Sequence, residues 1–523
     1  MFVKTFGSAI QGIDALTITI EVSVEKHGVK FYLVGLPDNA VKESQQRIET
    51  AIKHIGFKMP RFRLVVNMAP ADIKKAGAAY DLPIAVGIII ASEQSPCQLD
   101  LSKFMMMGEL SLDGTIQPIK GALPMAMQAK EEGFEGLIVP AQNAREAALV
   151  EGFSIYGVTH LQQVIDFLAN PATLHAMPAI QLEDHLFQGV TDINNDFNEV
   201  KGQQQIKRAM EIAAAGGHNI ILIGPPGAGK TMLAKRFPSI LPPFTLWEAL
   251  ETTKIHSVAG KLQKESGLLT RRPFRSPHHS ISDAALVGGG SLPQPGEISL
   301  AHNGVLFLDE LPEFKRSVLE VMRQPMEERK VTISRAKSAV DFPANFMLIA
   351  SMNPCPCGYY NHPQRSCSCP PGVVAKYLNK ISGPLLDRID LHIEVTPVNL
   401  SALVEHGAEE EKSDNIRRRV VNARNLQGNR YKDTPGVHCN AQVNGRLLNE
   451  HCRLSGSSTV LLRNAMEKLQ LSARAFDRIL KVSRTIADLE QSRDIETHHL
   501  AEAIQYRSLD RENWGRGFRD AAP

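Results

Sequence analysis

A glycine-rich segment near the middle of the chain lies between an apolar run and a stretch with helical spacing. Residues 224–231 read Gly-Pro-Pro-Gly-Ala-Gly-Lys-Thr; they follow Ile220-Ile-Leu-Ile223 and precede Met232-Leu-Ala-Lys-Arg. A strand, a Gly-rich turn and a helix start are the context in which the G-x-x-x-x-G-K-T pattern forms a phosphate-binding loop. Backbone N–H groups of such a loop curl around phosphate oxygens, and the helix start adds partial positive charge. The segment therefore predicts a P-loop that binds a nucleoside triphosphate.

Lys230 is expected to reach the β- and γ-phosphates of that triphosphate, and the Thr231 hydroxyl to bind Mg²⁺. Farther on, the four apolar residues Val305–Leu308 are typical of a strand buried on both faces of a parallel sheet. Ligands bind at the carboxyl ends of such strands. We therefore predict that Asp309 holds Mg²⁺ through water and that Glu310 orients the attacking water. The residues expected to contact the nucleotide are Gly224, Pro225, Pro226, Gly227, Ala228, Gly229, Lys230, Thr231 and Met232.

Composition is that of an ordinary globular protein. The 523 residues, 43% hydrophobic and 22% charged, allow three or four domains of roughly 100–200 residues each. A net charge of +2 neither requires nor excludes nucleic acid. The N-terminus has no signal-peptide pattern, and the apolar run Leu82–Ala91 is too short to cross a bilayer, so we expect a buried helix there and no membrane partner. Seven cysteines, four of them clustered, favour a reducing, cytoplasmic setting.

The first part of the chain alternates strand and helix patterns. Ile18–Val24 alternates with period two, and residues 30–34 and 62–67 are further strand candidates. Asp38 is expected to cap a helix. The apolar positions expected on one face of that helix are Val41, Ile48, Ala51, Ile52 and Ile55.

Composition changes then mark the domain boundaries. Pro171, Pro178 and a polar run interrupt the regular pattern, and after Pro397 a charged stretch leads into helical spacing that ends near Ile486. We predict a multidomain α/β protein. The expected parts are an α+β domain at 1–172, a linker at 173–196, a P-loop α/β core with a parallel sheet at 197–400 and a helical region at 401–523.

Two more polar residues follow structured segments of the core. The strand candidate Phe346–Met352 ends at Asn353, a neutral amide that can hydrogen-bond the γ-phosphate without adding negative charge. Arg388 follows a short helical segment, from which it can be presented to the nucleotide of a neighbouring subunit. Taken alone, an arginine of this kind is more often part of a surface salt bridge.

Several longer segments resemble the Mg-chelatase-like AAA+ ATPases. They are Lys201-Gly-Gln203, Phe274-Arg-Ser-Pro-His-His279, Pro295-Gly-Glu-Ile-Ser-Leu-Ala-His-Asn-Gly304, Asn353-Pro-Cys-Pro-Cys-Gly358 and Gly383-Pro-Leu-Leu-Asp-Arg-Ile-Asp-Leu391. With an additional N-terminal domain, the chain resembles the bacterial YifB/ComM family. The resemblance implies a ring, a hexamer, with ATP sites between subunits. It also implies that Asn353 is sensor 1, Arg388 the arginine finger and Arg474 sensor 2 on a C-terminal helical lid, with Arg478 as a competing candidate.

The N-terminal part resembles the Lon-protease catalytic fold, which is similar to a ribosomal-protein S5 domain. Asp81, in Gly77–Ala85, falls where that family carries its nucleophilic serine, and Leu123 falls at the catalytic lysine position, with Lys120 nearby. A Ser-Lys dyad needs an alcohol beside an amine with a depressed pKa. The chain has neither at these positions, so we expect a non-proteolytic module. Pairing within a solvated helix face is the expected role of Arg47.

Cysteines form a C-x-C, nine-residue, C-x-C pattern shortly after Asn353. Four thiolates so close in sequence can close a tetrahedral Zn²⁺ site, with His362 as a possible substitute ligand. The spacing is tighter than the usual C-x₂₋₄-C, so four reduced thiols in a loop remain the alternative. The four cysteines are Cys355, Cys357, Cys367 and Cys369.

Basic residues recur in three insertions of the core and the helical region. Residues 329–340 have the pattern of a β-hairpin that would project into the pore of a ring, where cations can track phosphates. The candidate nucleic-acid contacts in it are Arg329, Lys330, Arg335 and Lys337. The other two insertions contain Arg271, Arg272, Arg275, His278 and His279, and Arg417–Arg419, Arg424 and Arg430. A solvated charged face is the alternative for each.

Three functions are compatible with an ATP-hydrolysing motor. The first is a DNA translocase, a helicase or branch-migration motor that acts in recombination of transforming DNA, as the family resemblance implies. The second is a chelatase-type remodeller, although the metal-adhesion motif D-x-S-x-S of its partner is absent from the chain. The third is an ATP-dependent unfoldase or protease, which the missing Ser-Lys dyad disfavours.

Overall fold

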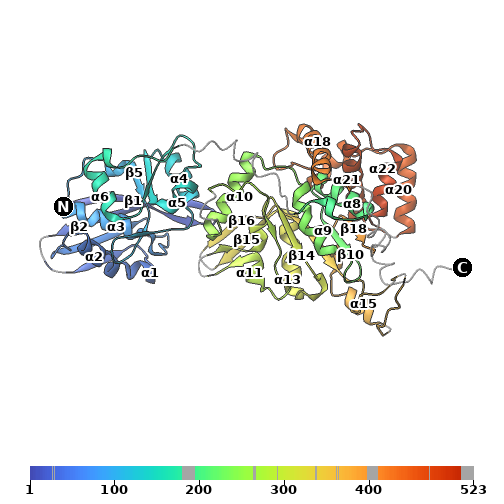
Figure 1. Ribbon diagram of the computed structural model, residues 1–523, viewed down its shortest axis with the longest axis horizontal. Coiled ribbons are helices and arrows are strands. Elements are labelled where there is room, and N and C mark those ends of the chain that lie inside the picture. Colours follow the sequence, from blue (N-terminus) through green and yellow to red (C-terminus); the bar gives the residue numbers. More distant parts are fainter. Residues whose placement is uncertain are drawn as a thin grey trace.

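The computed structural model describes residues 1–507 apart from 26–27, 29, 179–194, 263–266, 291–292, 336–337, 361, 363, 371, 397–409 and 470. Within this part, the molecule is elongated (Figure 1). The N-terminal elements lie at one end, the P-loop domain lies in the middle and the C-terminal helices lie at the other end.

A seven-stranded mixed sheet forms the centre of the N-terminal domain, in the order β3-β4-β2-β1-β5-β8-β9. β2 pairs antiparallel with β1 and β4, whereas β5, β8 and β9 continue the sheet in parallel. The strands are β1 (Phe2–Gln11), β2 (Asp14–Glu25), β3 (Phe31–Val34), β4 (Arg63–Ala69), β5 (Phe104–Met106), β8 (Gly136–Pro140) and β9 (Ser154–Val158). A separate short hairpin is formed by β6 (Glu109–Leu110) and β7 (Ile116–Gln117).

Helices cover both faces of this sheet. They are α1 (Asn39–Lys42), α2 (Ser44–His54), α3 (Asp81–Ala91), α4 (Ala122–Glu131), α5 (Ala141–Ala147) and α6 (Leu161–Ala169). α2, α3 and α6 share one hydrophobic cluster with β1, β2 and β4, and α4 and α5 share another with β5, β8 and β9. Every residue of α3 is buried, as the apolar run at 82–91 predicted. Asp38 caps α1 by accepting from the Val41 N–H at 2.9 Å, which confirms its predicted role.

Asp81 is buried, and Arg47 on α2 reaches it. The Arg47 guanidinium donates to both carboxylate oxygens, at 2.7 and 3.1 Å. The expectation that Arg47 pairs on a solvated helix face is therefore wrong, because its partner comes from a different helix. Burial raises the pKa of Asp81 to about 6, although the hydrogen bonds and charge of Arg47 oppose that shift. Asp81, the residue predicted to stand at the Lon nucleophile position, is thus half of a buried ion pair.

The P-loop domain is built on a parallel five-stranded sheet, in the order β11-β14-β17-β10-β18. Its strands are β10 (Ile220–Ile223), β11 (Phe274–Arg275), β14 (Val305–Leu308), β17 (Met347–Met352) and β18 (Leu391–Glu394). All four residues of β10 and of β14 are buried, as continuous apolar runs predict for a sheet covered on both faces. Two hairpins accompany the sheet: β12 (Gly288–Gly289) with β13 (Gln294–Pro295), and β15 (Lys330–Arg335) with β16 (Ser338–Pro343).

The helices of the P-loop domain are α8 (Gln204–Gly216), α9 (Lys230–Arg236), α10 (Leu246–Ala259), α11 (Asp283–Val287), α12 (Glu297–Leu300), α13 (Arg316–Val321), α14 (Arg323–Glu328), α15 (Val373–Leu378) and α16 (Gly383–Leu386). The C-terminal helices are α18 (Ser413–Tyr431), α19 (Gly445–His451), α20 (Gly456–Lys468), α21 (Ala473–Leu489) and α22 (Thr497–Gln505). Residues of α18 and α21 share one hydrophobic cluster with α8 and β10. The C-terminal helices are therefore packed onto the P-loop domain through a common core. A multidomain α/β fold with a parallel sheet and a helical C-terminal part is confirmed.

The N-terminal domain contacts α10 of the P-loop domain through α4, α5 and the residues that follow α5. Leu123 is fully buried and clusters with Leu149 and, from the P-loop domain, with Phe244 and Leu268. The Ser257 hydroxyl on α10 donates to Glu146, which also accepts from the Leu123 N–H at 2.9 Å. Leu123, the residue predicted to stand at the Lon lysine position, is thus part of an apolar contact between domains.

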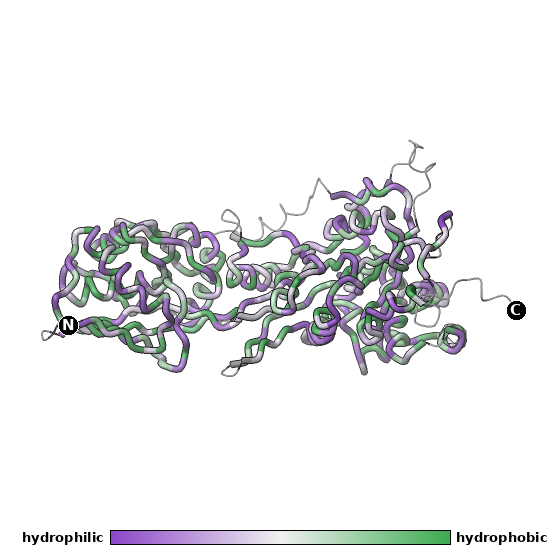
Figure 2. The backbone as a smooth tube through the Cα atoms, turned by 90° about the horizontal axis from the view of Figure 1, so that it is seen from below, coloured by the Kyte–Doolittle hydropathy of each residue, from purple (hydrophilic) through white to green (hydrophobic). Residues whose placement is uncertain are grey.

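The predicted domain boundaries remain predictions, because they fall largely outside the described residues. This holds for most of the linker at 173–196 and for the boundary at 400/401. Within the described chain, no helix is long and apolar enough to cross a membrane. Hydrophobic and hydrophilic stretches alternate along the whole length of the molecule in the hydropathy view (Figure 2).

Candidate functional site

The glycine-rich segment connects β10 directly to α9, as predicted. Gly224 follows the strand where a side chain has no room, because a Cβ there would lie 2.3 Å from the Val395 carbonyl oxygen. Gly229 precedes α9 with φ +85°, a left-handed conformation that glycine adopts without strain. The loop therefore has the close packing and the backbone path of a phosphate-binding turn.

Lys230 folds back over this loop. Its ammonium donates to the carbonyl oxygens of Gly224 and Pro225, at 2.6 and 2.9 Å, and to Asn353 Oδ1 at 3.1 Å. Burial lowers the pKa of Lys230, and the charges of Asp309 and Glu310 act in the opposite direction. The structure thus brings together the lysine of the P-loop and the amide at the end of β17, which the sequence assigned separately to the triphosphate.

Asp309 lies at the end of β14 and beside Thr231. The Thr231 hydroxyl donates to Asp309 Oδ2 at 2.8 Å, so that both predicted Mg²⁺ residues lie at one point. Ser351 on β17 donates to the other carboxylate oxygen. Sequence reasoning missed Ser351, although a hydroxyl within an otherwise apolar, buried strand is a recognisable signal. Hydroxyl and carboxylate oxygens are ligands that Mg²⁺ prefers, so these residues fit that ion.

Glu310 is exposed and has an unusual backbone conformation. Its φ is +55°, in the left-handed region that costs a residue with a side chain of order 1 kcal/mol or more. His279 lies next to it, with its Nδ1 3.7 Å from Glu310 Oε2. The sequence placed His279 in a basic insertion, and the structure brings it instead to the candidate catalytic carboxylate.

Arg388, Arg474 and Arg478 lie near the amino ends of the strands, whereas the P-loop lies at their carboxyl ends. The backbone N–H groups of Asp390 and Leu391 donate to the Asn219 carbonyl, which precedes β10, whereas the P-loop follows β10. A four-residue strand, about 13 Å long, therefore separates the loop that carries Arg388 from the P-loop of the same chain. Within one chain, these arginines lie away from the nucleotide loop.

The three arginines differ in exposure. Arg388 is buried and bonded to Glu327 Oε1 and the Pro384 carbonyl, each at 2.6 Å. Arg478 donates to the buried Asp390 at 2.8 Å. The Arg474 side chain is 62% exposed and lies 3.9 Å from Asp387. Arg474 is therefore accessible to a neighbouring molecule, while Arg388 must leave Glu327 to reach one.

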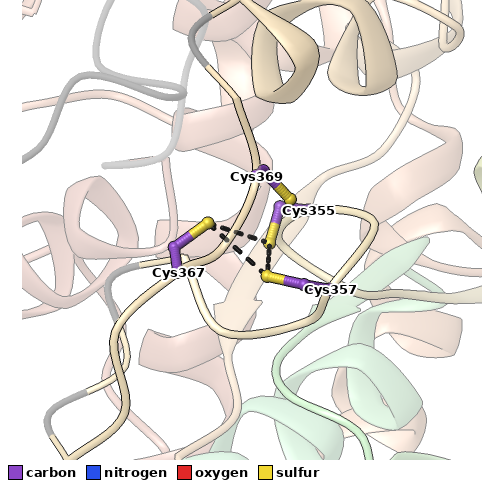
Figure 3. Close-up of side chains that lie close together, drawn as sticks. All are labelled: Cys355, Cys357, Cys367 and Cys369. Carbon is purple, nitrogen blue, oxygen red and sulfur yellow. Dashed lines mark hydrogen bonds between the residues drawn. The ribbon is translucent and has the colours of Figure 1, made fainter.

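All four side chains of the cysteine cluster converge in the loop after β17 (Figure 3). Their sulfur atoms lie within 4.8 Å of one another. Cys355 is fully buried, and burial raises the pKa of its thiol to about 12. Burial also opposes ionisation of Cys357, but the neighbouring Tyr359 backbone N–H and the Cys355 sulfur, 3.3 Å away, lower its pKa to about 5. His362 is outside this group; its Nδ1 accepts from two backbone N–H groups of its own loop.

The hairpin predicted at 329–340 is present as β15 and β16. Lys330 lies at its base and pairs with Asp341 at 2.9 Å. Arg329 precedes the hairpin and lines a cavity of about 1050 Å³ between α10, α18 and α21, away from the hairpin tip. Arg335 ends β15 next to the tip, and Lys337 lies outside the described residues.

Most arginines of the other two basic insertions are already paired within the chain. Arg272 pairs with Glu248 and Arg275 with Glu297. In the helical region, Arg419 bonds Glu211 and Glu411, and Arg430 bonds Asp488. Their positive charge is therefore largely compensated, which sequence reasoning did not foresee because the partners lie on distant elements.

Comparison with known proteins places this geometry in a family. Three models match the chain: "Magnesium chelatase, subunit ChlI" at residues 196–403, "Subunit ChlI of Mg-chelatase" at 20–143, and "Magnesium chelatase, subunit ChlI C-terminal" at 410–507. The competence protein ComM of Haemophilus influenzae is 44% identical over 509 residues, which cover 97% of each chain. YifB of Escherichia coli is 42% identical over 510 residues and 96% of each chain.

A partial similarity concerns the N-terminal domain. Lon protease 2 of Bacillus subtilis is 31% identical over 135 residues, which are 25% of this chain and 24% of that protein. This agrees with the predicted Lon-like N-terminal fold. The full-length matches decide the family: the chain belongs to the YifB/ComM family of Mg-chelatase-like AAA+ ATPases.

Proposed function

We propose that this protein is an ATP-hydrolysing ring motor that moves along DNA and drives branch migration during recombination of transforming DNA. The observation that carries the proposal is the convergence of Lys230, Thr231, Asp309 and Asn353 at the P-loop, with candidate transition-state arginines at the opposite edge of the same sheet. A motor of this kind turns hydrolysis into movement between neighbouring subunits.

ATP and Mg²⁺ are the ligands implied by the family, and the residues present fit them. Lys230 and the loop N–H groups would hold the phosphates, and Thr231 and Asp309 the ion. Mg²⁺ neutralises charge on the β- and γ-oxygens when bound. Glu310 would orient and polarise the attacking water, and Asn353 would hold the γ-phosphate side in place.

A hexameric ring explains the separation of the arginines from the P-loop. If each subunit presents its Arg388 and Arg474 edge to the P-loop of the next, every site is completed in trans. An arginine in that position stabilises the negative charge that develops on the transferred phosphoryl group. The 62% exposure of the Arg474 side chain supports its role at such an interface.

DNA is the proposed substrate of the motor. The β15–β16 hairpin supports this, because its tip carries Arg335 and, in the sequence, Lys337. In a ring, cations at a projecting hairpin would track backbone phosphates. Arg329 and Lys330 contribute less in this account, since one lies away from the tip and the other is paired with Asp341. The N-terminal domain would act as a non-proteolytic module for handling DNA.

We also propose that the four clustered cysteines bind a structural Zn²⁺ ion. Tetrahedral thiolate coordination with Zn–S distances of about 2.3 Å puts the sulfur atoms about 3.8 Å apart. The sulfur atoms of Cys355, Cys357 and Cys367 lie 3.3–3.7 Å from one another. All seven cysteines lie within the described chain and are free thiols, which supports the proposal of a reducing, cytoplasmic setting.

The test is the ATPase rate of the purified protein with four additions in turn: forked DNA, single-stranded DNA, an unfolded protein and a porphyrin. We expect the largest stimulation with forked DNA, and its loss in Lys230→Ala. Stimulation by the unfolded protein alone would assign an unfoldase, and by the porphyrin alone a chelatase-type remodeller; either result contradicts the proposal.

A further inference from the structure

The cysteine loop begins at the nucleotide site. Asn353, which accepts from Lys230 at 3.1 Å, lies two residues before Cys355. The Tyr360 N–H donates to Cys355 Sγ at 3.3 Å, so the first arm of the loop curls tightly around this sulfur. Whatever fixes Cys355 therefore also fixes the chain that carries Asn353.

The same loop also ends at the nucleotide site. After the second cysteine pair the chain enters α15, where the buried Tyr377 shares a hydrophobic cluster with Met352, the residue before Asn353. Leu308, which ends β14 just before Asp309, belongs to the same cluster as Tyr377. Burial, together with the charges of Glu313 and Glu310, raises the pKa of Tyr377. Both ends of the loop from residue 353 to residue 377 thus lie at the nucleotide site.

Between the arms, the loop packs directly on the P-loop. Gly358 has φ +83°, and a Cβ at this position would lie 2.4 Å from Pro226 Cδ. Since Pro226 is part of the glycine-rich segment, the cysteine loop forms a wall behind the phosphate-binding turn. Only a residue without a side chain permits this approach.

The cysteines cross-link the two arms. Cys355 and Cys357 are on the arm that leaves Asn353, and Cys367 and Cys369 are on the arm that leads to α15. The four sulfur atoms point into one space (Figure 3). A tetrahedral ion would therefore tie the arms together, in the way that structural Zn²⁺ orders short loops that lack a core of their own.

We infer that the Zn²⁺ site is a structural part of the nucleotide site: the ion closes the 353–377 loop against Pro226 and Asn353, and nucleotide affinity depends on it. This inference rests on the proposed function in requiring that the P-loop binds nucleotide. It adds that the P-loop wall is held by a metal whose ligands do not touch the nucleotide.

The experiment measures metal content and nucleotide affinity separately. Zinc and iron per chain are determined in the purified protein, and binding of a fluorescent ADP analogue is titrated. We expect about one zinc per chain in the parent protein. In the Cys367→Ser, Cys369→Ser double variant, we expect zinc to be lost and affinity to fall about tenfold, as when the binding-competent state drops to about a tenth of the population. Cys97→Ser, in the N-terminal domain, should retain both zinc and affinity.

Chelation answers the objection that the double variant fails to fold. Zinc removed from the folded parent protein with a strong chelator should lower nucleotide affinity by the same factor, and added Zn²⁺ should restore it. Unchanged affinity after complete zinc removal would overturn the inference, as would a parent protein that contains no zinc.

A matched pair of glycine variants tests the contact itself. Gly358→Ala introduces a Cβ against Pro226, whereas Gly372→Ala has nearly the same φ, +80°, and nothing within 4 Å of its Cβ. We expect Gly358→Ala to retain zinc and lose nucleotide affinity, and Gly372→Ala to lose less affinity. Equal affinity in the two variants would overturn the inference. Failure of the proposed function looks different: Lys230→Ala would then bind nucleotide as the parent protein does, whatever the zinc content.

Discussion

A side chain from outside its own motif lies next to Glu310. His279, whose Nδ1 lies 3.7 Å from Glu310 Oε2, comes from the loop after β11. We expect His279→Gln to lower kcat about tenfold while nucleotide affinity stays within about twofold, because His279 touches the carboxylate and lies away from the P-loop. The measurement is steady-state ATPase kinetics with a parallel binding titration.

His278→Gln is the control for that substitution. His278 bonds Ser280 at 2.8 Å, so its removal should change kcat much less. Equal losses in both variants would mean that the histidine pair has a general role in folding the loop.

Asp390 is a buried carboxylate that joins three segments. It accepts from the Asn219 N–H at 3.0 Å and from Arg478 at 2.8 Å, and His218 lies at 3.4 Å. Burial opposes its ionisation, but the charge of Arg478 and the contacts of His218 outweigh burial and lower the pKa of Asp390. A carboxylate with a lowered pKa stabilises the fold above its unfolded pKa, near 4, and loses that contribution as the pH falls below it.

Asp390→Asn should therefore cost about 3 kcal/mol of unfolding free energy at pH 7, because Arg478 loses its counter-ion. The difference in unfolding free energy between Asp390→Asn and the parent protein should become smaller below about pH 4. Urea unfolding at several pH values measures both effects. Asp414→Asn, which removes a half-exposed partner of Arg417, should stay within about 0.5 kcal/mol. A difference that widens on acidification would contradict the assignment.

At the residue scale, sequence predicted what local spacing fixes. Gly229, Lys230 and Thr231 are placed by one turn, so their joint position follows from the motif. The roles of Ser351 and His279 were not predicted, because each contacts a residue of a different segment: Ser351 contacts Asp309, and His279 lies next to Glu310. A side chain that acts across a sheet leaves no regular pattern in its own segment.

At the element scale, the β15–β16 hairpin carries basic residues at two different positions, its base and its tip. Lys330 is compensated by Asp341, while Arg335 ends β15 beside the tip. We expect Arg335→Ala to weaken binding of forked DNA and to reduce the slope of log K against log salt by about one, as the loss of one phosphate contact does. Lys330→Ala should change both quantities less. Fluorescence anisotropy across a salt series gives the two slopes; identical slopes would remove the hairpin tip from the DNA path.

Elements with a strong period were predictable from sequence. The alternation at Ile18–Val24 became part of β2, and the apolar run at 82–91 became α3, because burial demands a particular pattern in each case. The pairing of Arg419 and Arg430 was not predictable. Their acidic partners include Glu211 and Asp488, on α8 and α21, and only the tertiary fold brings those charges together.

At the scale of the whole molecule, Leu123 anchors the N-terminal domain to the P-loop domain. It is fully buried against Phe244 and Leu268, beside Glu146, whose pKa is raised by burial although hydrogen bonds oppose the shift. Leu123→Asp would place a second carboxylate there. We expect it to lower stability by about 3 kcal/mol or more and to separate unfolding of the two domains.

Calorimetry and limited proteolysis detect that separation. Met127→Asp, on the exposed side of the same helix, should leave a single transition near that of the parent protein. A single unshifted transition in Leu123→Asp would show that the domain contact contributes little to stability.

The central claim is that each nucleotide is hydrolysed at a site completed by the next subunit. Lys230→Ala removes the P-loop lysine and keeps Arg388, whereas Arg388→Ala keeps the P-loop and removes the arginine. After confirming that both variants fold and assemble, their ATPase rates are measured alone and co-assembled in equal amounts. We predict near-zero rates alone and recovery to about a quarter of the parent rate in the mixture, the share of interfaces that unite two intact halves in a head-to-tail ring. A mixture no faster than its components, or full activity of Arg388→Ala alone, would contradict the account.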